Sequence, residues 1–474
     1  MKGEERYPLL LLLFLPFFGC SSINTLYKLK DKLVNNAMHE WLYKDLYRSL
    51  PELGIHYAAV NRSVHSPHQL ANRIKNVFYR AVNGENITVA VLGGSISAGA
   101  TLYKDNNEDK IFFYALKKFW NDVVFPITGS KMLMRNIAIG AIGSDFYSYC
   151  LENYVQGNET DLVIWELSAN DYHRFDNRDV PPTLPLELLT RSILRLEKQP
   201  GVIYAHFFRG KDYKKELECN NLESDGANYL SMYYKLPSVS WRQLVCRRLV
   251  ATERLSFKKL FARDSSHPSV LGHAQMGYLL IHLFRKMFLR VIDDIILTTS
   301  EKFTDSTDLN LLEITVEPIP KPVFIKTQLV AEDSICFTFN LPSSGQMPHN
   351  RKKMLRVIRN DGFVISTAHG FLVRKDKTEG LRTKNPNVEL HLQINVPNHV
   401  ESSLKDWMIL IGSYSNFGGA VFFLDSKYSR VIETEKYAYG SIVAAVATRV
   451  QPGKHDLVIR SLKNGFFLSS IMLG

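Results

Sequence analysis

A chain of 474 residues is longer than a single hydrophobic core usually supports, so we expect two domains with extensions. Hydrophobic residues make up 45% of it and charged residues 22%, a balance that is typical of globular chains and excludes an intrinsically disordered one. The formal net charge of +11 is distributed, and its basic clusters at residues 247–248 and 351–353 have no aromatic residues between them. Nucleic acid is therefore not an expected partner, and the charge suits solubility or contact with anionic glycans or lipid head groups.

The first 22 residues have the pattern of a targeting segment. Residues 9–18 form an uninterrupted apolar run that small residues follow, which is typical of a secretory signal peptide and too short to span a bilayer as a helix. A retained N-terminal anchor is the alternative, and Gly19 before Cys20 faintly resembles a lipoprotein cleavage box. We expect a secreted or cell-surface protein whose membrane association, if any, involves only this segment.

The remaining cysteines are Cys150, Cys219, Cys246 and Cys336, and none of them forms the Cys-x-x-Cys spacing of a zinc site. In the secretory pathway they allow one or two disulfides. Cys219 and Cys246 enclose an irregular segment that a disulfide would hold, whereas Cys150, in a helical pattern, fits a buried free thiol. Three Asn-x-Ser/Thr triplets, which are glycosylation acceptors in a eukaryotic host, begin at Asn61, Asn86 and Asn158.

Two early segments have helical periodicity. Residues 23–60 mix Leu, Tyr and Trp with charged residues at roughly helical spacing, which favours helices on the outside of a domain. Residues 70–82 repeat apolar side chains at three- and four-residue steps, and Gly84 follows as a helix stop. Three histidines in this region have irregular spacing and no acidic partners, so we expect solvated loop residues rather than metal ligands. They are His56, His65 and His68.

The next stretch has the pattern of a buried strand that ends in a tight turn. Residues 87–92 are β-branched or apolar, and Gly93 and Gly94 follow at once. Two glycines let the backbone turn sharply, so we expect the Ser95 hydroxyl to stand exposed at the carboxyl end of the strand, where open α/β sheets place their ligands. An ordinary strand-to-loop turn with a polar cap is the alternative.

Two more strands are predicted downstream. Residues 132–144 indicate a strand that opens into a glycine-bearing turn, and residues 162–171 have a buried-strand pattern that ends in Asn170 and Asp171. Asn170 either serves a site at this edge of the sheet or caps the next turn. Glu166, near the end of the same strand, has no role that the pattern assigns.

The segments that follow continue the alternation of helix and strand. Residues 184–198 predict a helix and residues 201–208 a strand. Residues 209–245 are polar, Tyr-rich and weakly periodic, so we expect a loop region that lines a substrate cleft. Asp264 and His267 then lie on a loop just before another helix, where the histidine is free to reach a neighbouring strand end.

From about residue 300 the pattern changes to short alternating runs separated by Gly- and Pro-containing turns, which predicts an antiparallel β-sandwich. Such a module could bind carbohydrate or form a structural lid. Its aromatic residues are more typical of core or strand surface than of sugar platforms, among them Tyr414, Phe417 and Tyr437. We expect two distinct domains with few shared core residues. The expected division is a targeting segment at 1–22, an α/β domain at 23–299, a linker at 300–309 and a β-sandwich at 310–474.

Three of these blocks together resemble the SGNH hydrolase superfamily, the GDSL-like esterases and acyltransferases. They are the turn at Ser95, the strand end at Asn170, and the late Asp-x-x-His formed by Asp264 and His267. The resemblance covers roughly residues 70–290. It implies a flavodoxin-like, three-layer α/β/α sandwich around a mostly parallel sheet, which the alternation of strands and helices also indicates.

The resemblance implies a role for each of these residues. Ser95 would attack an ester carbonyl, His267 would take its proton, and Asp264 would orient the imidazole. The backbone N–H groups of Ser95 and Gly143, together with the Asn170 amide, would hold the oxyanion. This chemistry requires no metal and no organic cofactor.

Two positions depart from the family pattern. The family often has an Asn two residues before the first glycine of its Gly-x-x-Gly step, and this chain has Ala138 there, before Gly140. Its third block normally begins with Gly, and Ser168 takes that place. The oxyanion turn therefore has an alternative register, in which Ala141 donates its N–H in place of Gly143.

The expected function is that of a serine esterase that acts on O-acyl groups, with O-acetylated carbohydrates as the favoured substrates and other small esters as further candidates. One alternative is an O-acyltransferase that uses the same serine, because only the nature of the acceptor, water or a sugar hydroxyl, separates the two reactions. The other is a non-catalytic glycan-binding surface protein that keeps the fold without the activity.

Overall fold

A computed structural model of the chain provides the coordinates, and the structural statements below concern the residues that it describes. These are residues 23–35, 52–102, 107–172, 183–216, 219, 223–252, 254–302, 314–324, 334–345, 348, 354–367, 377–398, 406–415, 417–434, 440–462 and 465–474. The expected targeting segment at 1–22 and Tyr437 lie outside them.

The N-terminal half is built on a six-stranded sheet. In spatial order its strands are β1 (Val64–His65), β6 (Ser238–Ser240), β5 (Gly201–His206), β4 (Leu162–Glu166), β2 (Ile87–Gly93) and β3 (Met132–Asn136). All neighbours are parallel except β1 and β6, which are antiparallel. The mostly parallel sheet expected from the apolar runs is therefore confirmed.

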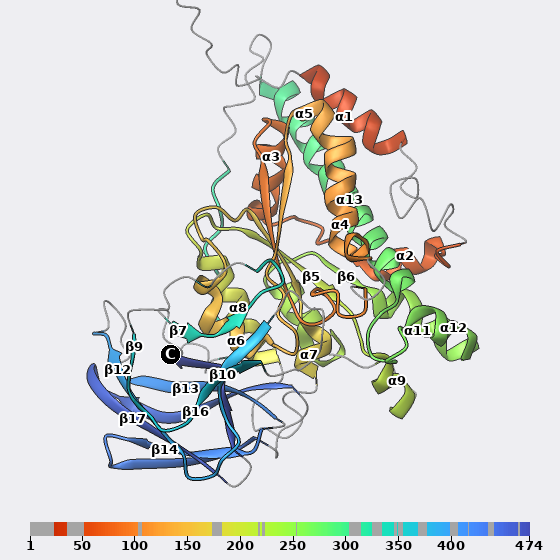
Figure 1. Cartoon of the computed structure of the whole chain (residues 1–474). Coiled ribbons are helices and arrows are strands. Elements are labelled where there is room, and N and C mark those ends of the chain that lie inside the picture. Colours follow the sequence, from red (N-terminus) through yellow and green to blue (C-terminus); the bar gives the residue numbers. More distant parts are fainter. Residues whose placement is uncertain are drawn as a thin grey trace, which may run out of the picture.

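Helices cover both faces of this sheet. On β2, Val89 and Val91 contribute to one buried cluster while Ala90 and Leu92 contribute to another, as the twofold alternation of a strand requires. Helices of the first face are α1 (Ile23–Asn35), α3 (Asn72–Val82), α4 (Phe112–Phe119) and α13 (Val270–Lys302), several of which lie together in Figure 1. Helices of the second face are α6 (Ser144–Cys150), α8 (Thr183–Arg195) and α10 (Asn228–Tyr233). The arrangement is three-layered.

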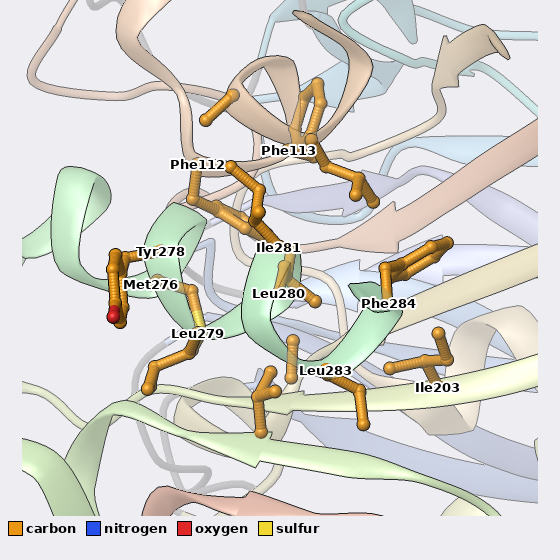
Figure 2. Packing of buried hydrophobic residues seen from close by; sticks show 14 of the residues in the cluster. Phe112, Phe113, Ile203, Met276, Tyr278, Leu279, Leu280, Ile281, Leu283 and Phe284 are labelled. Carbon is orange, nitrogen blue, oxygen red and sulfur yellow. The ribbon is translucent and has the colours of Figure 1, made fainter. Parts of the chain in front are cut away.

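Helix α13 contributes most to the first cluster. Figure 2 shows its side chains, among them Leu280 and Phe284, beside Phe112 of α4 and Ile203 of β5. These four side chains are at most 1% exposed. Burial of each such side chain stabilises the fold by about 1.5 to 3 kcal/mol, so α13 holds α4 and the sheet together.

Residues 209–245 differ from the expected loop region. They contain β6, α10 and three further elements, namely α9 (Gly210–Glu216), η6 (Glu223–Ala227) and the start of α11 (Trp241–Thr252). Helix α12 (Arg254–Leu260) follows beyond the segment. Each element within the segment is short, so its periodicity is weak in the sequence. Leu230 and Leu236 are buried, and the disulfide between Cys219 and Cys246 closes the segment, as its position suggested.

The remaining short helices of this half are α2 (Tyr57–Ser63), η3 (Glu108–Lys110), η4 (Trp120–Val124), α5 (Phe125–Thr128), η5 (Leu151–Asn153) and α7 (Ser168–Tyr172).

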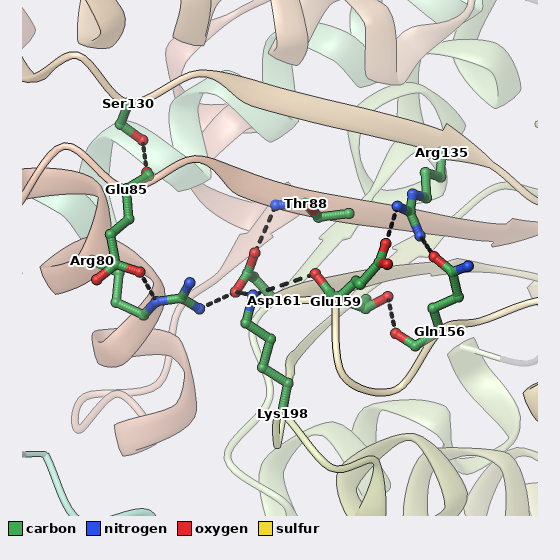
Figure 3. Close-up of polar contacts among 10 residues, drawn as sticks. Arg80, Glu85, Thr88, Ser130, Arg135, Gln156, Glu159, Asp161 and Lys198 are labelled. Carbon is green, nitrogen blue, oxygen red and sulfur yellow. Dashed lines mark hydrogen bonds and ion pairs between the residues drawn. The ribbon is translucent and has the colours of Figure 1, made fainter. Parts of the chain in front are cut away.

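A buried carboxylate joins the strands at the amino edge of the sheet. Asp161, just before β4, accepts the backbone N–H of Thr88 at 2.7 Å and pairs with Arg80 and with Lys198, the latter at 2.7 Å (Figure 3). Its side chain is 1% exposed. This polar cluster fixes the edge opposite to the one that carries Ser95.

The C-terminal half is all-β. A five-stranded antiparallel sheet has the order β15 (Tyr428–Glu433), β14 (Gly419–Leu424), β17 (Gly453–Ser461), β12 (Glu389–Val396) and β9 (Leu355–Asn360). A four-stranded antiparallel sheet has the order β16 (Ser441–Val450), β13 (Trp407–Tyr414), β19 (Ser470–Leu473) and β7 (Ile335–Thr338). A smaller sheet contains β10 (Val364–Thr367), β11 (Lys377–Thr383), β18 (Phe466–Leu468) and β8 (Asn340–Leu341).

One apolar core lies between the β sheets. It joins inward side chains of the five-stranded sheet, such as Leu392 and Ile459, to those of the four-stranded sheet, such as Ile411 and Ile471. The two-sheet organisation expected from alternating runs is thus present. We refer to residues 334–474 as the β domain.

The two halves share more than the sequence suggested. No described strand of the β domain joins the first sheet, but Leu410, Val443 and Met472 point out of the four-stranded sheet into the second core cluster of the α/β domain. A disulfide joins Cys150 at the end of α6 to Cys336 in β7. The interpretation of Cys150 as a free thiol is therefore wrong, because its partner lies 186 residues away and no local pattern indicates it.

The connection between the halves also differs from expectation. Helix α13 continues to Lys302, so residues 300–302 of the expected linker at 300–309 are helical and its remainder lies outside the described residues. Residues 323–324 form a bend rather than a strand, and their N–H groups donate to the buried Glu187 carboxylate at 2.5 and 2.9 Å. Among the described helices, none is both long and apolar enough to cross a membrane.

Candidate active site

The candidate site lies at the carboxyl edge of the parallel sheet, where β2 ends. Ser95 is half-buried in the turn that follows this strand. The Gly94 N–H donates to the Glu166 carbonyl of the neighbouring strand at 3.3 Å, and the Ala98 N–H returns to the Gly94 carbonyl at 2.9 Å. A Cβ on Gly94 would lie 2.2 Å from the Asn170 amide nitrogen, so only glycine allows this approach.

Three predicted side chains meet at this turn although they come from distant parts of the chain. His267 Nε2 lies 2.7 Å from Ser95 Oγ, within hydrogen-bond distance, across a separation of 172 residues. His267 Nδ1 lies 2.5 Å from Asp264 Oδ2. The structure therefore brings Ser95, His267 and Asp264 into one hydrogen-bonded chain, in the order that proton transfer from the hydroxyl requires.

A tight turn presents the histidine. Asp264 Oδ1 accepts the N–H groups of Ser266 and His267 at 2.9 and 3.0 Å, and its other oxygen faces the imidazole. Partial burial alone would raise the pKa of Asp264, but the hydrogen bonds and charge of His267 and the bond from Ser266 outweigh it and hold the pKa far below its usual value. The carboxylate is therefore ionised at neutral pH. Lys214 Nζ, 2.8 Å from Ser265 Oγ, ties the turn to α9.

Asn170 lies beside the serine, in the short helix α7 rather than at the expected strand end, because β4 already ends at Glu166. Its Nδ2 donates to the Ile142 carbonyl at 2.6 Å. Because this amide nitrogen carries two hydrogens and also lies against Gly94, one N–H remains to serve an oxyanion at the Ser95 turn.

Gly143 has a different geometry from the one expected. It precedes α6 with φ −124° and ψ −178°, an extended conformation that any residue adopts, so the turn does not require a glycine there. The carbonyl and N–H of a trans peptide point in opposite directions, and Ile142 O points at Asn170. The Gly143 N–H therefore points away from the Asn170 amide nitrogen, and the two groups converge on one oxyanion only if this peptide turns over.

The two positions that depart from the family pattern have defined contacts. Asn136, two residues before Ala138, accepts the Ala138 N–H at 3.1 Å and donates to the Ser97 carbonyl at 3.0 Å. This side chain joins the turn that carries Ser95 to residues 138–143, which we call the oxyanion turn. Ser168 donates its hydroxyl to the Phe207 carbonyl at 3.0 Å. The sequence pattern indicated no role for Asn136, because its partner Ser97 lies 39 residues away.

A buried glutamate accepts hydrogen bonds from the turn that carries Ser95. Ser97 donates its hydroxyl and its N–H to Glu166 Oε2 at 2.8 and 3.3 Å. Burial raises the pKa of Glu166 to about 8, against the smaller opposing effect of the bonds from Ser97, so the carboxyl is mostly protonated at neutral pH. No short motif marks a glutamate at the end of an apolar strand, which is why the sequence assigned it no role.

No protein-family model matches the sequence, and no curated protein matches it significantly. Solved structures are similar in fold. A two-domain esterase that is active on acetylated mannans is 17% identical, with a TM-score of 0.58 over 87% of this chain and 97% of the other. Its crystal structure with mannopentaose gives the same values. At this identity the likeness shows the fold alone, which combines a mixed α/β sheet with a separate region of antiparallel sheets.

Proposed function

We propose that the protein is a serine esterase of the SGNH type that removes O-acyl groups, above all O-acetyl groups, from carbohydrates. The observation that carries this proposal is the hydrogen-bonded chain from Ser95 through His267 to Asp264. Ser95 and His267 are 172 residues apart in the sequence, and their contact is the one that the resemblance implies. A chance resemblance would scatter the two residues across the fold. A fold shared with an esterase that is active on acetylated mannans supports the substrate class.

The geometry supports a two-step acyl transfer. His267 Nε2 takes the proton of Ser95 Oγ as this oxygen attacks the ester carbonyl, and Asp264 stabilises the imidazolium. The Ser95 N–H and the remaining Asn170 N–H stabilise the tetrahedral oxyanion, and Gly143 joins them if its peptide turns over. Collapse of the tetrahedral intermediate expels the sugar alkoxide, which takes the proton from His267 and leaves the acyl group on Ser95. Water then attacks the acyl-enzyme by the same steps, and the acid and free Ser95 are the products.

The test is a Ser95→Ala variant measured on acetylated oligosaccharides and small acetyl esters. We expect a loss of at least about 10³-fold in kcat with unchanged folding, because the serine is a half-buried turn residue. A fluorophosphonate should label the parent once and the Ser95→Ala variant not at all. Ser97→Ala is the matched control and should keep the label, because Ser97 is fully buried and bonded to Glu166.

The outcomes separate the alternatives. Acyl transfer to added sugar in preference to water would favour the acyltransferase that uses the same serine. Binding of glycans without labelling of Ser95 or turnover would replace the proposal by a non-catalytic binding protein.

We also propose that the protein is secreted or displayed at the cell surface. The apolar N-terminal segment supports this location, and so do the two disulfides, which persist in oxidising compartments. Expression of the full chain in eukaryotic cells tests it. We expect protein in the medium or on the surface, and N-terminal sequencing then distinguishes a cleaved signal from a retained anchor. Protein that stays in the cytosol would contradict the proposal.

A further inference from the structure

The β domain contacts the oxyanion turn directly. Ser441, the first residue of β16, donates both its N–H and its hydroxyl to the Ala141 carbonyl, at 3.1 and 2.8 Å. Tyr414, the last residue of β13, donates its hydroxyl to the Gly140 carbonyl at 3.3 Å. Both side chains are almost fully buried, so water does not compete for these carbonyls from their side.

A second segment of the β domain holds the beginning of the same turn. Ser343 donates its N–H and its hydroxyl to the Ala138 carbonyl, both at 3.0 Å, and the Ser344 N–H donates to the Asn136 carbonyl at 3.2 Å. Asn136 is the residue whose side chain reaches the serine turn. The backbone that approaches the candidate oxyanion site is therefore bonded to the β domain at the carbonyls of residues 136, 138, 140 and 141.

The turn needs this support because one of its residues has an unfavourable backbone conformation. Ala141 has φ 63°, in the left-handed region that residues with a Cβ avoid. Tyr414 and Phe467 pack around it, and Gly440, at φ 122°, lets the strand start close to its carbonyl. A strained residue persists where its surroundings determine its conformation, and here those surroundings come from the β domain.

Two contacts, one from each half of the chain, fix the peptides that follow. The Ala141 carbonyl is held by Ser441, and the next carbonyl, that of Ile142, is held by Asn170 beside the serine. The direction of each carbonyl sets the direction of the N–H in the same peptide. Ser441 therefore fixes the peptide whose Ile142 N–H donates to the Ile139 carbonyl at 3.4 Å. Tyr414 fixes the preceding peptide, which carries the Ala141 N–H, and Asn170 the following one, which carries the Gly143 N–H.

We propose that the β domain is part of the catalytic unit and that Ser441, together with Tyr414, is a positioning residue that sets the backbone of the oxyanion turn. The inference rests on the proposed esterase function for its kinetic consequence. It assigns the β domain a task in the chemical step, distinct from any contact that the domain makes with a glycan.

Kinetics of three variants of the full chain test the proposal. Ser441→Ala removes the hydroxyl donor, and we expect kcat for a small acetyl ester to fall between about 10-fold and 10²-fold, with KM within about 3-fold of the parent. Ser441→Thr keeps the donor and should restore most of kcat. Ser413→Ala is the matched control, since its buried hydroxyl donates to the Phe467 carbonyl at 2.6 Å within the β domain and not to a carbonyl of the turn.

Two readouts distinguish positioning from a general loss of stability. An alkyl boronic acid, which forms a tetrahedral adduct with a nucleophilic serine, should bind Ser441→Ala more weakly by about the same factor as kcat falls, and Ser413→Ala as tightly as the parent. Hydrogen exchange of the amides of residues 141–143 should accelerate in Ser441→Ala and not in Ser413→Ala. The exchange measurement does not depend on turnover, so it tests the contact even if the proposed function fails.

Unchanged kcat, boronate affinity and amide exchange in Ser441→Ala would overturn the inference. Equal losses in Ser441→Ala and Ser413→Ala would do the same, because they would indicate destabilisation of the β domain in general. If the parent chain and its Ser95→Ala variant hydrolyse no ester, the proposed function fails by itself, and the exchange result still decides whether Ser441 holds the turn.

Discussion

Ser95, His267 and Asp264 contribute unequally to the proposed reaction. The serine forms the covalent bond and the histidine moves the proton, whereas Asp264 orients the imidazole through a contact of 2.5 Å and receives two backbone N–H bonds that hold its own turn. The aspartate therefore acts through the histidine. Loss of an orienting group leaves the covalent chemistry possible.

From this difference we expect a ranking of single substitutions. Ser95→Ala and His267→Ala should each lower kcat to nearly the same residual level, and Asp264→Ala should keep about 10-fold to 10²-fold more activity than either. Steady-state kinetics on one small acetyl ester measure the ranking. The Ser95→Ala, His267→Ala double variant should be no worse than either single one, and an additive loss would contradict the idea that the residues act as a unit.

Glu166 makes stability depend on pH in a defined direction. Burial raises its pKa in the folded state to about 8, from an ordinary value of 4.5. Between these values the folded chain keeps a proton that the unfolded chain has released, so the contribution of Glu166 to stability is full below about pH 4.5 and is lost as the pH rises to about 8.

Glu166→Gln tests this dependence because glutamine stays neutral and can still accept from Ser97. The free energy of unfolding in urea should be similar for parent and variant near pH 5, and the variant should be more stable by a few kcal/mol near pH 8.5. Parallel stability profiles for the two proteins would show that the carboxyl does not titrate as its burial implies.

At the scale of elements, candidate catalytic side chains lie at one edge of the first sheet and structural charges lie at the other. Asp161 lies at the amino edge, where its buried carboxylate holds Arg80, Lys198 and the Thr88 N–H. Ser95 lies at the carboxyl edge, one strand length away. A substitution at the amino edge should therefore lower the free energy of unfolding without changing kcat, and one at Ser95 should lower kcat without changing folding.

Asp161→Asn keeps an oxygen for Thr88 but leaves the two cations without their partner. We expect a loss of about 2 to 4 kcal/mol in the free energy of unfolding, less than for a fully buried ion pair because Arg80 and Lys198 are partly exposed, with kcat unchanged. Glu159→Gln is the control, since Glu159 is half-exposed in its pair with Arg135 and should cost less than about 1 kcal/mol. Equal costs for the two substitutions would contradict this account of the Asp161 cluster.

The elements also show how far the sequence could predict this structure. Buried strands were recognisable in residues 87–92, 162–171 and 201–208 because continuous apolar runs need no tertiary information, although the second strand ends at Glu166 and a short helix follows it. Ser95 and Asn170 were expected at the site because each follows such a strand end. Residues 209–245 were misread because their elements are too short for a periodic signal.

Contacts between distant residues account for most of what the sequence left out. Cys150 pairs with Cys336, Glu166 supports Ser97, and Ser441 bonds to Ala141 across 300 positions. Each residue looks ordinary in its local pattern, and only the folded chain brings the partners together. The direction of the Gly143 N–H was inaccessible for the same reason, since the Asn170 bond to Ile142 sets it.

At the scale of the whole molecule, the two halves are joined by an apolar interface and a covalent bond. Leu410 and Met472 of the β domain are buried in the second core cluster of the α/β domain, next to the Cys150 and Cys336 pair. An apolar interface of this kind couples the stabilities of two domains, because unfolding either one exposes the core of the other. We therefore expect the chain to unfold in a single transition.

Removal of each disulfide tests this coupling. The Cys150–Cys336 bond spans 186 residues and the Cys219–Cys246 bond spans 27, so the logarithmic dependence of loop-closure entropy makes the first more stabilising by about 2 kcal/mol. Cys150→Ser, Cys336→Ser should lower the calorimetric midpoint more than Cys219→Ser, Cys246→Ser, while both keep one transition because the apolar interface remains. A larger shift for the shorter loop would contradict the loop-length argument. Two resolved transitions in the parent chain would mean that the β domain unfolds independently of the α/β domain, and the apolar interface would then not couple their stabilities.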